Sequence, residues 1–108
     1  MDPRAHYVAR VLSLYMKIPG TLKRTLRADR SFARELYDKG VAFDTVESAF
    51  VLAVARRTLR DDTEPIEPIR CLRYLSPVIQ ELAQEPPFPE YIEYLKTRLI
   101  DEGTFPLD

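Results

Sequence analysis

The chain has 108 residues, of which 45% are hydrophobic and 31% charged, and a formal net charge of −1. This composition is typical of one small folded domain, and it excludes an intrinsically disordered chain and a membrane-spanning helix, because no apolar run approaches about 18 residues. The single cysteine, Cys71, and single histidine, His6, exclude a disulfide framework and a closed zinc site within one chain. With no signal-peptide pattern at the N-terminus, we expect a cytoplasmic protein that does not act at a membrane.

The first predicted helix begins at Pro3, with Asp2 as its cap, and ends before Pro19-Gly20. A strongly basic stretch, residues 21–30, follows. A second helix is predicted from about Ala28 to Lys39, because apolar residues recur at helical spacing and Gly40 suits a left-handed C-terminal position.

A third helix is predicted after Asp44, which we interpret as the cap of a capping box with Glu47, and it extends to about Arg60. It is apolar on most sides, a pattern typical of a helix at the centre of its domain. Its last turn carries the arginines, which suit a helix C-terminus.

The acidic residues 61–68 predict a loop. A further helix is expected to begin near Pro68, and Pro77 either restarts it, with Ser76 as a new cap, or kinks it before its end near Ala83. A last helix is predicted from about Pro89 to Ile100, with four residues on its apolar side: Tyr91, Ile92, Leu95 and Leu99. We therefore expect an all-α protein, a single compact bundle of about five helices with a proline-interrupted fourth helix, over residues 1–102, and a C-terminal tail over 103–108.

Charge is unevenly distributed along the chain. Residues 1–60 hold 12 Lys/Arg and 6 Asp/Glu, whereas residues 61–108 hold 4 Lys/Arg and 11 Asp/Glu. The basic half can face a polyanion, or the two halves can attract each other within one molecule or between copies. The third alternative is that these are solvated helix faces without a partner.

The residue types needed for catalysis do not form a recognisable pattern. His6 has no serine, cysteine or carboxylate at triad-like spacing, and Cys71 in a helix is interpreted as a half-buried, inert thiol. Asp61, Asp62, Glu64 and Glu67 could hold a hard cation such as Mg²⁺, but they match no calcium-loop spacing, and we interpret them as a solvated acidic loop. The three isolated glycines form no phosphate-binding loop. We therefore expect no enzyme, no cofactor, no metal and no small-molecule substrate.

Basic residues carry the leading functional hypothesis. Such residues around a helix start and a helix end predict contacts to nucleic-acid phosphates, with salt-dependent and weakly sequence-specific binding. The candidate nucleic-acid-binding residues are Lys23, Arg24, Arg27, Arg30, Arg56, Arg57 and Arg60, with Arg70 and Arg73 next. Tyr15, Tyr37, Tyr74, Tyr91 and Tyr94 either stack on bases or are half-buried core residues. DNA or RNA, single- or double-stranded, remains open.

Residues 36–82 carry a resemblance. The residues that carry it are Gly40-Val41, Ala49, Ala53, Arg56-Arg57, Pro68-Ile69-Arg70, Tyr74 and Pro77-Val78-Ile79, with Pro19-Gly20-Thr21 upstream. This pattern resembles short bacterial helical proteins from integrase- and transposase-rich genome regions. More remotely, it is similar to the C-terminal helical domain of DnaD-type primosomal proteins. The resemblance implies an accessory role in a mobile-element or replication nucleoprotein complex, with the aromatic-containing segment contributing to DNA binding.

A second hypothesis is a protein–protein adaptor or oligomerisation module. Here the acidic C-terminal half is the active surface, and a protein partner or a second copy, as in a homodimer, contacts the last helix. The predicted anchors are Tyr91, Tyr94 and Leu95, because aromatic residues dominate interface energetics.

Overall fold

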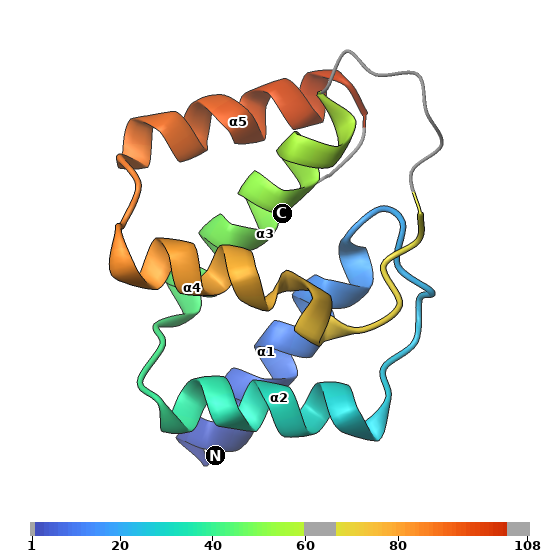
Figure 1. Cartoon of the computed structure of the whole chain (residues 1–108), viewed down its shortest axis with the longest axis vertical. Coiled ribbons are helices and arrows are strands. Elements are labelled where there is room, and N and C mark those ends of the chain that lie inside the picture. The colour runs from blue at the N-terminus through green and yellow to red at the C-terminus, as the bar shows by residue number, and fades with distance from the viewer. Residues whose placement is uncertain (1, 60–66, 104–108) are drawn as a thin grey trace.

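Five α-helices and one 3₁₀ turn make up the described part of the protein, residues 2–59 and 67–103, in a computed structural model. The helices are α1 (Pro3–Lys17), α2 (Arg27–Asp38), α3 (Phe43–Thr58), α4 (Ser76–Gln84) and α5 (Pro89–Asp101), with the 3₁₀ turn η1 (Leu72–Leu75) directly before α4. The expected all-α bundle is confirmed (Figure 1). The molecule measures 41 × 29 × 24 Å.

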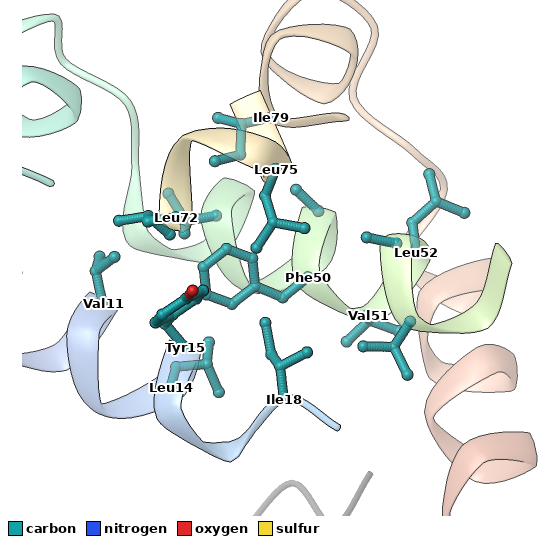
Figure 2. Close-up of a cluster of buried hydrophobic side chains, with 14 of the residues drawn as sticks. Val11, Leu14, Tyr15, Ile18, Phe50, Val51, Leu52, Leu72, Leu75 and Ile79 are labelled. Carbon is teal, nitrogen blue, oxygen red and sulfur yellow. The ribbon is translucent and has the colours of Figure 1, made fainter. Parts of the chain in front are cut away.

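Helix α3 lies at the centre of the bundle. It packs against α1, α4, α5 and η1, and five consecutive residues, Val51 to Ala55, are all buried. In Figure 2, Tyr15 of α1 and Phe50 of α3 meet in the middle of the core, beneath Leu72 and Leu75 of η1. This arrangement confirms that the helix apolar on most sides is the central one.

The predicted helix ends are confirmed where a capping side chain or a glycine determines them. Asp2 accepts a hydrogen bond from the Arg4 backbone N–H at 3.1 Å and caps α1. Gly40 has φ +77°, and the N–H groups of Gly40 and Val41 donate to the carbonyls of Tyr37 and Leu36, at 2.9 and 3.0 Å. These two bonds form a Schellman motif, so the predicted end of α2 is confirmed.

Two predicted helix starts are wrong. The cap of α3 is Ala42, and Asp44 lies inside the first turn, where its charge still suits the helix dipole. No helix begins at Pro68. Residues 67–71 are extended, because the Ile69 N–H donates to the Gly20 carbonyl at 2.7 Å and Ile69 forms an isolated parallel bridge with Thr21. Of the two alternatives at Pro77, the restarted helix is confirmed: α4 begins at Ser76, which is its first residue rather than its cap, and the 3₁₀ turn η1 precedes it.

Asp29 is a buried carboxylate in the first turn of α2, with only 1% of its surface exposed. One carboxylate oxygen accepts from the Leu26 N–H at 2.8 Å, and the other accepts from the Leu72 N–H at 2.9 Å. Both amides are at helix starts, where backbone N–H groups lack intrahelical partners. Asp29 therefore joins α2 to η1 across 43 residues of sequence.

Candidate nucleic-acid interface and a second surface groove

The outer face of α2 carries a stripe of three arginines. Arg27, Arg30 and Arg34 occur at i, i+3 and i+7, so they lie on one side of the helix, and all three are exposed. The opposite side holds the buried residues Phe32, Ala33 and Leu36. Among the described residues, none makes an ion pair or hydrogen bond with any of the three guanidinium groups.

Two further exposed arginines lie on the segments next to the start of α2. Arg24 lies in the loop before α2, and Arg70 lies in the extended segment that is joined to Gly20 on one side and to Asp29 on the other. Both side chains are exposed and have no ion pair within the ranges 2–59 and 67–103. We call Arg24, Arg27, Arg30, Arg34 and Arg70 the arginine face. Arg34 was missed in the sequence analysis, although its helical spacing from Arg27 and Arg30 could have revealed it.

Two of the predicted cations have internal roles instead. Lys23, with φ +59°, turns its ammonium group back to donate to the carbonyls of Met16 and Ile18, at 3.1 and 2.8 Å, where α1 ends. Arg73 pairs with Glu35 at 2.8 Å and lies over the Phe32 ring, 4.4 Å from its centroid. Arg73 thus holds η1 against α2, and its charge is balanced by a carboxylate.

The arginines at the end of α3 are also engaged. Arg56 makes a two-bond pair with Glu81 of α4, at 3.0 and 2.8 Å, which raises the pKa of Arg56 and lowers the pKa of Glu81. Arg57 donates to the Tyr74 hydroxyl at 3.2 Å and to the Glu67 carbonyl. Arg60 lies outside the described residues. The two predicted basic groups therefore differ: Arg24, Arg27 and Arg30 have no partner among the described residues, whereas Arg56 and Arg57 at the end of α3 bind within the protein.

The tyrosines differ in how accessible their rings are. Tyr15 is buried in the core, and this burial raises its pKa to about 12, with smaller contributions from Asp29 and Cys71. Tyr37 is half-buried against Tyr7, at 5.3 Å between ring centroids. Tyr74 is 54% exposed. Of these three rings, Tyr74 is therefore the one that is open to a base, and it lies beside Arg57.

A second surface feature is a groove of about 500 Å³ formed by α3, α4 and α5. Its floor is apolar, with Leu52 and Ala55 on the C-terminal half of α3 and Leu59 directly after the helix. Its walls are the end of α4 and the start of α5, which are joined through Pro86 and Pro87. In Figure 1 this connection lies at the left, and the groove elements share no helix with the arginine face.

Exposed aromatic rings line this groove. Phe88 is 80% exposed, Tyr91 49% and Tyr94 54%. The prediction that Leu95 is an exposed anchor is corrected: Leu95 is 5% exposed, because it faces α3 in the core. Tyr91, expected on the buried side of its helix, lies at the edge. Phe88 was missed, although an apolar ring between Pro87 and Pro89, outside any helical pattern, is the available signal.

The rim of the groove carries balanced charges. Arg56 and Glu81 neutralise each other. Arg98 donates to the Tyr94 hydroxyl at 3.1 Å, which raises the pKa of Arg98, and it also pairs with Glu102 at 3.9 Å. Glu85, at the end of α4, is exposed and has no ion pair with a described residue. The groove is therefore apolar inside and close to neutral around its edge.

No group of three metal-ligating side chains occurs within residues 2–59 and 67–103. Asp61, Asp62 and Glu64 lie outside those ranges, as does the tail over 104–108. His6 is exposed on α1, and Cys71 is half-buried. None of the described helices has the length and apolarity needed to cross a membrane.

The chain was compared with protein-family models, curated proteins and solved structures. No protein-family model, no curated protein and no solved structure matches the chain. The function is therefore argued from the two surfaces alone.

Proposed function

We propose that this protein is a small, non-enzymatic nucleic-acid-binding protein that contacts phosphates through the arginine face. The observation that carries the proposal is the stripe of Arg27, Arg30 and Arg34 on α2, exposed and without described partners. Along the helix the stripe spans about 10 Å, at about 1.5 Å rise per residue. It offers several guanidinium groups to one stretch of phosphate backbone.

Helix stability does not explain why these arginines are where they are. Arg27 and Arg30 lie in the first turn and a half of α2, where the positive end of the helix dipole disfavours cations by about 0.3–1 kcal/mol each. Both lie on the side of α2 away from its buried residues Phe32, Ala33 and Leu36. A polyanionic partner accounts for cations at a site that the fold itself disfavours.

The side chains of this face are arginines, which bind phosphates and can also pair with guanine, but the face carries no amide side chain that could read adenine. The chain contains no asparagine, and its two glutamines, Gln80 and Gln84, lie on α4. These are the side chains that pair with adenine in the major groove. Phosphate contacts position a protein without reading sequence, so we propose weakly sequence-specific binding. A place in a mobile-element or replication complex is part of the same proposal and rests on the sequence resemblance.

The test is fluorescence anisotropy with labelled single-stranded DNA, duplex DNA and RNA, at about 50 mM and about 200 mM salt. The perturbed protein is Arg27→Gln/Arg30→Gln. The control, Arg10→Gln/Lys17→Gln, removes the same charge from exposed positions of α1. Circular dichroism should show that both variants stay folded, because the α2 variant removes cations that oppose the helix dipole.

We expect wild-type binding that weakens at least about tenfold between the two salt concentrations. The α2 variant should lower the slope of log affinity against log salt by about 2, since each lost phosphate contact lowers it by about 0.9. The control should change affinity by less than about threefold. The proposal is overturned if the wild type binds none of the three nucleic acids at low salt, or if both variants weaken binding equally.

A further inference from the structure

The groove on α3, α4 and α5 combines a protruding ring and a hollow in one patch. Phe88 projects from the connection between α4 and α5 with 80% of its surface exposed. The hollow beside it has the floor formed by Leu52, Ala55 and Leu59. Two identical surfaces of this kind can fill each other's hollows, because each brings a protruding ring to the hollow of the other.

We propose that this groove is the interface of a homodimer in which two copies are related by a twofold axis. In such an isologous interface a contact from residue i to residue j occurs twice. Phe88 of each copy then enters the groove of the other. The second copy is thus the occupant, and the proposal is independent of nucleic-acid binding.

The exposed apolar area is large enough to form the centre of such an interface. Taking about 200 Å² for a fully exposed aromatic side chain, Phe88, Tyr91 and Tyr94 together expose on the order of 350 Å². A standard interface buries about 800 Å² on each partner, with a polar rim around an apolar centre. Three of the seven large exposed hydrophobic residues in the described part of the chain line this groove: Phe88, Tyr91 and Tyr94.

The balanced charges on the rim of the groove favour a second copy of the chain over a strongly charged partner. The rim holds two cations, Arg56 and Arg98, and two anions, Glu81 and Glu85, so two identical rims do not repel each other. Glu85 lies at the connection end of the groove, and Arg98 lies ten residues beyond Phe88, or about 15 Å along α5. A twofold axis perpendicular to α5 exchanges these ends, so the proposed dimer has this axis, and Glu85 of one copy lies opposite Arg98 of the other, twice.

The first test is the mass in solution, by size-exclusion light scattering over a range of protein concentrations. We expect the wild type to approach twice its 12.5 kDa chain mass. Tyr94→Glu should weaken the dimer at least about tenfold, because it buries a charge at the centre of the interface. Tyr74→Glu is the matched control, since Tyr74 has the same 54% exposure but lies on η1, and it should leave the dimer intact.

The second test uses the twofold geometry. Glu85→Arg alone and Arg98→Glu alone each place like charges opposite one another twice, so each variant should be at least about tenfold weaker as a dimer. An equimolar mixture of the two variants should form a heterodimer, because both charge pairs are restored in it. Neither exposed side chain supports the core, so both variants should remain folded.

A monomeric wild type at the highest concentration overturns the proposal. So does a dimer that Tyr94→Glu and Tyr74→Glu leave equally stable, and so does a mixture of the two charge variants that remains monomeric. A heterodimer formed from two monomeric variants supports it, because only a reciprocal contact between positions 85 and 98 predicts that result.

Discussion

Replacing Asp29 with alanine removes the acceptor for two backbone N–H groups in one change. The Leu72 N–H lies in a residue with no exposed surface, and it would be left without a partner in the core. The Leu26 N–H belongs to a residue that is 42% exposed, so water can replace the lost carboxylate there. The two losses therefore differ in size.

For Leu72 the loss is that of a buried, unsatisfied N–H, about 1–3 kcal/mol. For Leu26 it is the loss of a helix cap, about 1 kcal/mol. Together they predict that Asp29→Ala lowers the free energy of unfolding by about 3 kcal/mol, a large share of the ~5–15 kcal/mol that stabilises a domain. Asp29→Asn should lose somewhat less, because its single carboxamide oxygen still accepts from one of the two amides.

Urea unfolding followed by circular dichroism measures both values at neutral pH. Asp38→Ala is the matched control: it removes another carboxylate of α2, one that pairs with Arg4 at 2.7 Å on the surface. That change should lower stability by less than about 1 kcal/mol, as exposed ion pairs do. If Asp29→Ala is no more destabilised than Asp38→Ala, the two hydrogen bonds of Asp29 do not stabilise the packing of η1 on α2, and the reasoning is refuted.

Three further predictions concern stability. Burial raises the pKa of Tyr15 to about 12, so the unfolded chain releases the hydroxyl proton at lower pH than the folded protein does. The free energy of unfolding should therefore fall as pH rises from about 10 to about 12. In parallel urea titrations, Tyr15→Phe should lose less stability than the wild type over that range. Gly40→Ala should lower the free energy of unfolding by about 1–2 kcal/mol, because position 40 has a positive φ. Gly20→Ala should lower it by more, because its new Cβ also lies 3.2 Å from the Arg57 guanidinium. Equal melting temperatures for the two variants would contradict this prediction. Phe50→Ala should lower the free energy of unfolding by about 3–5 kcal/mol, since Phe50 is fully buried at the centre of the core. A loss below about 1 kcal/mol in urea unfolding would show that the core does not depend on this ring.

The helices that could be predicted are those whose ends are determined by local chemistry. Asp2-Pro3 starts α1, Gly40 ends α2, and the paired prolines at 86–87 separate α4 from α5. Each depends on a side chain or a φ value that acts within one turn. The segment after Pro68 could not be predicted in this way, because its extended form depends on a hydrogen bond to Gly20, 49 residues earlier in the chain.

The candidate sites show the same limit. A count of basic residues could not distinguish Arg30, which has no described partner, from Arg57, which holds Glu67 and Tyr74. The difference depends on which segments pack beside each arginine. Likewise, Leu95 and Tyr94 are neighbours in sequence, but one faces α3 and the other faces solvent. The sequence predicted which residue types matter, and the packing decided which of them are accessible.

The place of α5 at the edge of the bundle has a consequence for its local stability. In the described part of the chain α5 has its main packing with α3, whereas α3 itself is enclosed by three helices and η1. A helix held on one side can open without unfolding the rest of the domain. Backbone amides of α5 should therefore exchange with solvent deuterium faster than those of α3, through an opening that costs less than global unfolding. Any partner that covers the free side of α5 would slow that exchange first.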